Sequence, residues 1–173
     1  PEDHLQAVNI LKDDLAIRGN KQTTGIFGTA WLLEVMSKFG LVQEAFDMVA
    51  REDFPGWRYM LDNGATTLWE TWKESDNVFS QNHPMFGVIS IWFHKWIGGI
   101  DPVDGGFSRM MIHPAPVVGL DNFSVSRKIS GKEIGVSWKR NKSEIVFILT
   151  VPKDTEVIWV PQLLSPNQLK TIV

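Results

Sequence analysis

Cysteine is absent from the 173-residue chain, which excludes disulfides, thiol catalysis and thiolate metal sites. The lack of cysteine does not indicate a cellular compartment, because cysteine-free proteins occur both inside and outside cells. No apolar run reaches the roughly 18 residues that a membrane-spanning helix requires, so we expect no membrane partner. No signal peptide is visible at the start. The chain opens on Pro1 in place of methionine, which is typical of a processed product or a fragment.

Positive charge is also in short supply. The chain has 17 lysines and arginines against 20 aspartates and glutamates, and its formal net charge is -3. The basic residues are scattered along the sequence, whereas binding to a phosphate backbone requires a clustered basic surface. We therefore expect no nucleic-acid partner.

The familiar cofactor and metal patterns are missing as well. No G-x-S-x-G elbow, P-loop or dinucleotide glycine pattern occurs, so no cofactor is expected. The histidines lack the i, i+4 or similar spacing of metal ligands, and no metal is expected at His4, His83, His94 or His113.

What the chain does contain is typical of a soluble globular protein. Hydrophobic residues make up 43% of it and charged residues 21%. Its length suits one large domain or two small ones, and we expect two. Tryptophan is abundant, with eight tryptophans and ten phenylalanines against a single tyrosine. Indole rings fill cores and also stack on sugars and bases, so this abundance permits a binding role without requiring one.

Helical periodicity runs over residues 1–100. A first helix, with apolar residues every three or four positions, should end at Gly19-Asn20. Thr23 and Thr24 offer N-cap oxygens to a second helix. Its apolar stripe before Gly40 consists of Phe27, Trp31, Leu32, Val35, Met36 and Phe39.

Two more helices are predicted in this part of the chain. The third covers residues 41–51. The fourth starts at Asn82, His83 and Pro84, which resemble a cap and a first turn, and it continues as HPMFGVISIWFHKWIGGI. Because this fourth segment is apolar on nearly every face, we expect it to be buried.

Residues 101–173 have a different sequence pattern. Short runs rich in β-branched and aromatic residues recur about every ten residues, separated by Gly, Pro, Asn and Asp, which predicts an antiparallel sheet or sandwich. The helix breakers of residues 98–106, GGIDPVDGG, mark the boundary. The expected fold class is α plus β in separate domains, residues 1–100 and 101–173.

A long connection, residues 52–83, separates the third and fourth helices. A loop of this length inside a compact domain is usually functional or disordered. Its aromatic residues would be costly to leave in water, so we expect it to be folded and functional. They are Phe54, Trp57, Tyr59, Trp69, Trp72 and Phe79.

Glu70 is the candidate catalytic residue in this loop. A carboxylate flanked by two indoles is partly desolvated and leaves room for a bound water, which suits a general base. A surface glutamate or a helix cap is the alternative, and from composition alone it is the more frequent case.

The residues around Glu70 allow two interpretations. Trp57, Trp69 and Trp72 could form a stacking platform for a sugar ring, with Tyr59 at its polar edge, but core packing explains each of them equally well. His83 could donate a hydrogen bond to a sugar hydroxyl. The alternative is a histidine that merely precedes a proline at a helix start.

Several segments together resemble a known family. Residues 19–40 (GNKQTTGIFGTAWLLEVMSKFG), 54–72 (FPGWRYMLDNGATTLWETW) and 82–100 (NHPMFGVISIWFHKWIGGI) are similar to the end of the catalytic domain of bacterial α-L-rhamnosidases. IHPAP at 112–116 and the strand-rich tail resemble their C-terminal β-sandwich. The resemblance runs from Gly19 to about Pro161.

This resemblance implies a fold and an activity. The fold is part of an (α/α)₆ toroid followed by an antiparallel β-sandwich. The activity is removal of terminal α-linked L-rhamnose from glycosides or polysaccharides with inversion, which uses one carboxyl group as acid and another as base. The T-T-x-W-E motif of the family places the base at Glu70, and His83 is implied as a sugar contact. Trp57 and Tyr59 match the aromatic segment that precedes the motif.

The resemblance also covers too few helices for a complete toroid. The missing N-terminal part of the same enzyme is an expected partner, since it would carry the general acid. The isolated chain should therefore be inactive, and its uncovered apolar faces should favour self-association or a partner chain. Two alternatives stay open: a different (α/α)₆ glycosidase, and a noncatalytic carbohydrate-binding or structural module.

Overall fold

The computed structural model of the chain describes residues 2–74, 79–142, 144–163 and 169–172. The chain forms two compact units, Pro1–Ile89 and Ser90–Val173. No helix in the described ranges is both long and apolar enough to cross a membrane. The division into domains predicted from the sequence, 1–100 and 101–173, stays a prediction.

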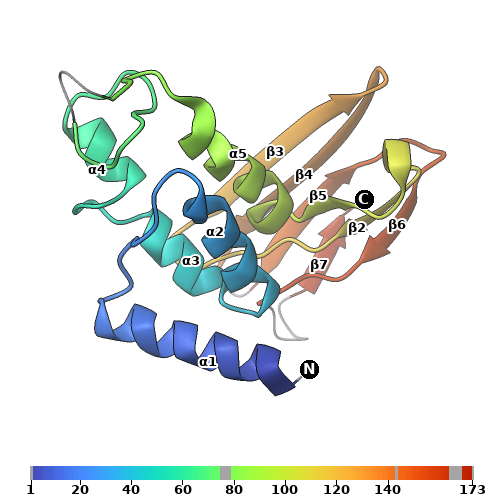
Figure 1. The fold of residues 1–173 in the computed structure, drawn as a ribbon. Helices are drawn as coiled ribbons and strands as arrows, with labels where there is room; N and C mark the ends of the chain where they lie inside the picture. The colour runs from blue at the N-terminus through green and yellow to red at the C-terminus, as the bar shows by residue number, and fades with distance from the viewer. Residues whose placement is uncertain (1, 75–78, 143, 164–168, 173) are drawn as a thin grey trace. The chain divides into compact units, whose positions relative to one another are not determined.

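The first unit is helical (Figure 1). It contains α1 (Glu2–Ile17), α2 (Gly28–Lys38), α3 (Val42–Val49), α4 (Trp57–Asp62) and the 3₁₀ turn η1 (Pro84–Gly87). The chain leaves α1 through Gly19 and Asn20, whose φ angles are 65° and 55°. This left-handed exit confirms the predicted stop.

The start of α2 corrects the sequence prediction. The helix begins at Gly28 after Phe27, and no side chain caps it. The hydroxyl of Thr24 instead accepts a hydrogen bond from the amide of Gln22. Thr23 and Thr24 are therefore not its N-caps, because a turn at residues 26–27 separates them from the start of the helix at Gly28.

The core of the first unit lies between α2 and α3, which pack as a hairpin around Gly40 (Figure 1). The most deeply buried apolar residues of this hairpin are Leu33, Met36, Leu41, Val42, Ala45 and Met48. Part of the predicted apolar stripe is wrong, because Phe27 and Trp31 are 74% and 72% exposed. The buried face of α2 is rotated toward Leu33.

The predicted fourth helix is three pieces with different winding. The 3₁₀ turn η1 is followed by α5 (Val88–Trp92) and by the π turn η2 (Phe93–Ile97). The sequence suggested burial on all sides, which is wrong for Ile91, a residue 67% exposed. Phe86, Trp92 and Ile97 are buried as expected.

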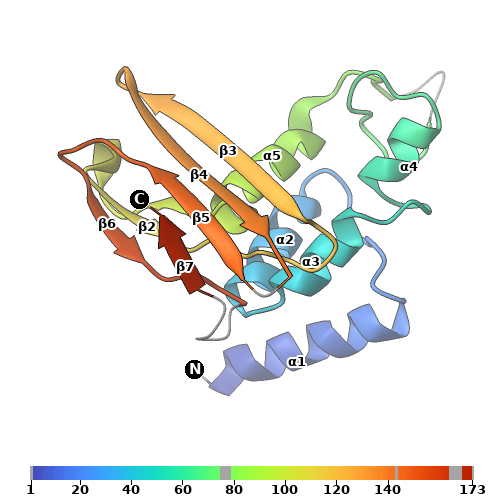
Figure 2. The same cartoon turned by 180° about the vertical axis from the view of Figure 1, so that it is seen from behind.

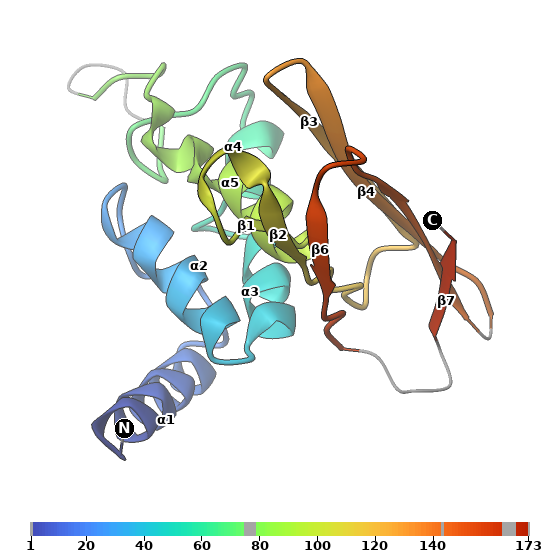
Figure 3. The same cartoon turned by 90° about the vertical axis from the view of Figure 1, so that its right-hand side faces the viewer.

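The second unit contains two sheets (Figures 2 and 3). The first has the strand order β1-β2-β6, formed by β1 (Ile100–Pro102), β2 (Arg109–Ile112) and β6 (Glu156–Trp159). The second has the order β3-β4-β5-β7, formed by β3 (Asn122–Ile129), β4 (Lys132–Arg140), β5 (Ile145–Thr150) and β7 (Leu169–Ile172). The short 3₁₀ turn η3 (Gly105–Phe107) precedes β2.

The pairings confirm an antiparallel arrangement for most of this unit. Pairs β1/β2, β3/β4 and β4/β5 are antiparallel, while β6 and β7 join their sheets in parallel. The core combines Ile100, Met110 and Ile112 of the first sheet with Ile134 and Val136 of the second. A shared apolar core of two sheets is the arrangement expected of a sandwich.

A tight junction lies where the π turn η2 meets the strands. Gly99 has φ +73, and a Cβ on it would be 2.2 Å from the backbone nitrogen of Pro114. The Gly99 carbonyl accepts the His113 backbone N–H at 2.9 Å. Only glycine combines this backbone angle with so close an approach.

The His113 ring is buried beside this junction and has polar partners on both sides. Its Nδ1 lies 3.1 Å from the Gln162 side-chain nitrogen, and its Nε2 lies 3.7 Å from the Asp101 carboxylate. Lys95 Nζ is 3.9 Å from the same carboxylate. The His113 ring and, at longer range, the Lys95 ammonium hold the pKa of Asp101 below its ordinary value.

Gly99→Ala should destabilise the protein by at least about 2 kcal/mol, because the Cβ meets fixed backbone and alanine disfavours this φ angle. Denaturant unfolding measures the loss. Gly105→Ala is the matched control, since no atom lies within 4 Å of the point that a Cβ on Gly105 would occupy. Equal stability of the two variants would contradict the close approach.

Asp101→Asn should remove stability in a pH-dependent way. Because the folded-state pKa of Asp101 is lowered, its contribution is present above its ordinary pKa of 3.8 and is lost as the pH falls through the lower folded value. At pH 6 the variant should be less stable by about 1 kcal/mol, a value reduced by solvent screening. Urea unfolding at pH 6 and pH 2 tests this, and an unchanged difference at the two pH values would count against the pairing.

Candidate functional site

Glu70 lies in the connection between α4 and η1, opposite Ser80. The Glu70 backbone N–H donates to the Ser80 carbonyl at 2.8 Å. The Ser80 backbone N–H in turn donates to Oε2 of the Glu70 carboxylate, also at 2.8 Å. Glu70 is therefore held at both its backbone and its side chain by one residue of the facing segment.

Two further contacts align these segments. The His83 backbone N–H donates to the Leu68 carbonyl at 2.8 Å, and the Thr67 hydroxyl donates to the Gln81 carbonyl. Residues 67–70 thus run antiparallel to residues 80–83. This pairing satisfies backbone groups that an irregular loop would otherwise leave to solvent.

The Glu70 side chain is half-buried, and its two oxygens differ. Oε2 accepts from Ser80, whereas Oε1 has no donor among the residues that the structure describes. A carboxylate fixed through one oxygen keeps the other oriented and able to accept a proton from water. The arrangement can therefore supply a preorganised base.

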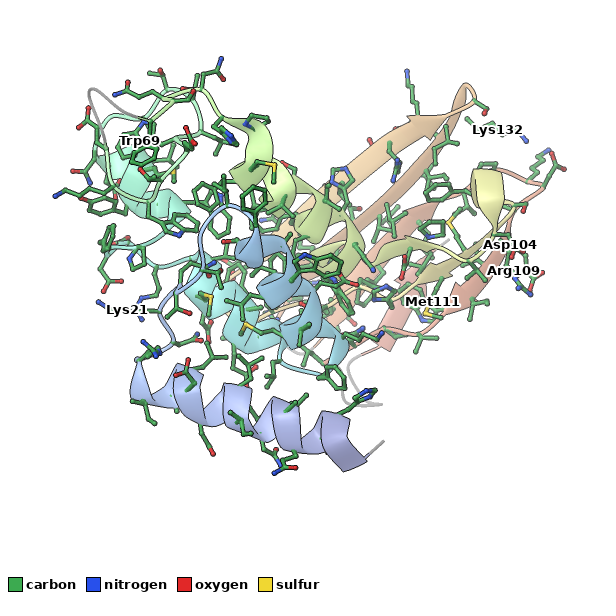
Figure 4. The ribbon with its side chains drawn as sticks, in the orientation of Figure 1. Lys21, Trp69, Asp104, Arg109, Met111 and Lys132 are labelled. Carbon is green, nitrogen blue, oxygen red and sulfur yellow. The ribbon has the colours of Figure 1, made fainter. Side chains whose placement is uncertain are left out.

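The tryptophans beside Glu70 are buried. Trp69 and Trp72 are 4% and 8% exposed, and Trp69 lies in the loop next to α4 (Figure 4). The Trp72 ring lies 3.8 Å from that of Phe86 and 4.9 Å from that of Trp57, centroid to centroid. This packing agrees with the expectation of a folded loop for the part of the loop that is described.

Two indole N–H groups are also used inside the protein. Trp57 Nε1 donates to the Phe86 carbonyl at 3.0 Å, and Trp72 Nε1 donates to the Thr24 carbonyl at 2.7 Å. A stacking platform made of Trp57, Trp69 and Trp72 stays a prediction. The geometry supports a different role for these rings, which is to hold the segment that carries Glu70 in place.

Tyr59 and Arg58 lie on α4. The Tyr59 ring makes an edge contact with Phe54 at 5.3 Å, and Phe54 itself is 46% exposed. Arg58 forms an ion pair with Asp62 at 2.9 Å, one helical turn away. Tyr59 as a substrate contact also remains a prediction.

His83 caps the turn η1. Its Nδ1 accepts the Met85 backbone N–H at 3.4 Å, and Pro84 occupies the first position of the turn. A ring that accepts at Nδ1 carries its proton on Nε2. His83 therefore does precede a proline at the start of a turn, as the structural alternative for this residue supposed. This role uses only Nδ1 and leaves the Nε2–H available as a donor.

An apolar pocket of about 260 Å³ adjoins the start of the Glu70 segment. It is lined by Trp57, Met60, Leu61, Ala65, Thr66, Thr67 and Leu68. No group of three His, Asp or Glu residues within the described ranges is arranged to hold a metal ion.

Sequence reasoning missed Ser80. Its role comes from a backbone N–H, which every residue except proline has, so no side-chain pattern marks it. The only signal available was the length of the loop, which must return to Glu70 before η1 begins.

Comparisons with known proteins match both units. The model of the bacterial alpha-L-rhamnosidase 6 hairpin glycosidase domain matches residues 1–97, and that of the bacterial alpha-L-rhamnosidase C-terminal domain matches residues 99–165. An "Alpha-L-rhamnosidase" of Formosa agariphila is 28% identical over 169 residues, which cover 92% of this chain and 18% of that protein.

Solved structures of alpha-L-rhamnosidases also align with this chain. An alpha-L-rhamnosidase from Dictyoglumus thermophilum aligns with a TM-score of 0.86 and 29% identity, over 95% of this chain and 19% of that chain. A Streptomyces avermitilis alpha-L-rhamnosidase complexed with L-rhamnose aligns with a TM-score of 0.82 and 25% identity, over 87% and 16%. The chain spans less than a fifth of the length of these relatives. The expected fold class, a helical-hairpin domain followed by a sheet-rich domain, is confirmed.

His83→Ala should lower the unfolding free energy by about 1 kcal/mol, because the Met85 N–H loses its acceptor. His83→Asn is the matched variant, since its side-chain oxygen can accept the same N–H and should recover most of the loss. Chemical denaturation measures both. If the two variants lose equal stability, the cap contributes nothing.

Proposed function

The chain belongs to the bacterial α-L-rhamnosidase family, and we propose that it supplies the general base for hydrolysis of terminal α-linked L-rhamnose from glycosides or polysaccharides. The observation that carries this proposal is the held carboxylate of Glu70, with Oε2 bound by the Ser80 N–H and Oε1 left without a donor among the described residues. Family membership adds the substrate class.

Hydrolysis with inversion sets the geometry that this base must meet. The two carboxyl groups of an inverting glycosidase stand roughly 6.5–9.5 Å apart, so that a water fits between the base and the anomeric carbon. Glu70 would take a proton from that water while the water attacks the sugar. The leaving oxygen needs a second, protonated carboxyl group on the opposite face.

We place that acid outside the part of the relatives that this chain matches, which is less than a fifth of their length. A base alone activates water but does not protonate the leaving group. The isolated chain is therefore expected not to turn over rhamnosides.

His83 can take part in binding the sugar. With Nδ1 accepting from Met85, its Nε2–H is a donor of fixed direction, suited to a hydroxyl oxygen. A cap that also contacts the ligand would fix the ring before the sugar arrives, which reduces the ordering cost of binding.

Glu70→Gln in the complete gene product should lower kcat for an aryl α-L-rhamnoside more than tenfold, equivalent to about 1.4 kcal/mol or more of barrier. Glutamine keeps an oxygen for the Ser80 N–H but cannot accept the proton of water. Glu74→Gln is the control, because Glu74 is exposed in the same loop.

A fall of less than tenfold for Glu70→Gln would show that Glu70 is not the base. Hydrolysis of another glycoside in preference to the rhamnoside would favour a different toroid glycosidase. Sugar binding without any turnover by the complete gene product would favour a noncatalytic module.

A further inference from the structure

A buried polar cluster lies just before and within the first turn of α2. Gln22 is 2% exposed and Thr29 is fully buried. The Gln22 side-chain nitrogen donates to the hydroxyls of Thr24 and Thr29, each at 2.8 Å. The two hydroxyls are 3.1 Å apart. Polar groups in an apolar interior are costly unless they are paired, so the two hydrogen bonds that the Gln22 side-chain nitrogen donates fix the conformation of residues 22–29. The Gln22 side-chain oxygen is buried and has no partner among the described residues.

Gly28 lets Thr24 approach the helix. A Cβ at position 28 would lie 2.9 Å from the Thr24 Cβ and 3.0 Å from its Cγ2. Those atoms belong to a stiff β-branched side chain, so a larger residue would push Thr24 and its backbone away from α2.

The Thr24 carbonyl is where this cluster meets the proposed base. It accepts the Trp72 indole N–H at 2.7 Å, and Trp72 is two residues beyond Glu70. The Trp72 ring is buried against Phe86 and Trp57, so these rings and the Thr24 carbonyl together set its position. On the other side of Glu70, Trp69 is also buried.

We propose that Gln22 and Thr29 are positioning residues, which hold the Thr24 carbonyl so that Trp72 fixes the segment carrying Glu70. This inference rests on the proposed function of Glu70. The cluster acts indirectly: among the described residues its side chains share no hydrogen bond with the carboxylate or with Ser80, and it determines where the chain on the C-terminal side of Glu70 is attached.

Such a link matters because an attacking water tolerates little displacement. Moving a catalytic group by about 1 Å can cost on the order of 100-fold in rate. Binding of the sugar depends on many other groups, so loss of the link should lower kcat while KM stays within about twofold.

Thr29→Val tests the link, with Thr29→Ser as its matched partner. Valine keeps the shape but removes the hydroxyl and leaves a Gln22 N–H without its acceptor, whereas serine keeps the hydroxyl. In the complete gene product, Thr29→Val should lower kcat about tenfold or more and Thr29→Ser should restore it to within about threefold. Hydrogen exchange of the Trp72 indole N–H, assigned by NMR from its loss in Trp72→Phe, should accelerate at least about tenfold in Thr29→Val but not in Thr29→Ser.

A pair of glycine variants keeps the test independent of side-chain polarity. Gly28→Ala displaces Thr24 and should reproduce both effects of Thr29→Val. Gly25→Ala should produce neither, because nothing lies within 4 Å of its Cβ position. Alanine also favours the helix start at residue 28, so a loss of activity there cannot be ascribed to weaker helix formation.

The two readouts separate the inference from the proposed function. If indole exchange is unchanged in Thr29→Val and Gly28→Ala, or if it accelerates while kcat stays constant, the positioning role is overturned. If Glu70→Gln leaves kcat within tenfold, the proposed base is wrong whatever the exchange rates show. Faster exchange with lower kcat, both recovered in Thr29→Ser, supports the link.

Discussion

The orientation of the Glu70 carboxylate in this fold depends on one hydrogen bond, from the Ser80 backbone N–H to Oε2. A free glutamate side chain samples several rotamers and presents its oxygens in many directions. Here one oxygen is fixed and the other keeps its lone pairs for a proton. The bond is local, but it holds only as long as residues 67–70 and 80–83 stay paired.

The aromatic residues around the loop supply that stability. Trp57, Trp72 and Phe86 form one packed group, and the carbonyls of Phe86 and Thr24 accept the two indole N–H groups. Burial of such rings is worth a few kcal/mol each, far more than one surface hydrogen bond. The loop is thus built from the same interactions as a core, which explains why so many tryptophans occur where the sequence has turn residues.

Much of this is visible in the sequence, and the failures have physical causes. Gly19-Asn20 and Gly40 mark helix ends because left-handed exits select such residues. Glu70 stands out through its motif and its indole neighbours. Ser80 does not, because it acts through its backbone, and Thr24 resembles a helix cap although its partner is Gln22. The exposure of Trp31 shows that periodicity gives an apolar face but not what covers it.

The most direct test of the central claim is a crystal structure of the complete gene product with a rhamnoside analogue bound. We expect a water within about 3.2 Å of Glu70 Oε1, in line with the anomeric carbon on the face opposite the leaving oxygen, and Oε2 still bound to the Ser80 N–H. A Glu70 side chain directed into bulk solvent, with another carboxylate holding that water, would contradict it.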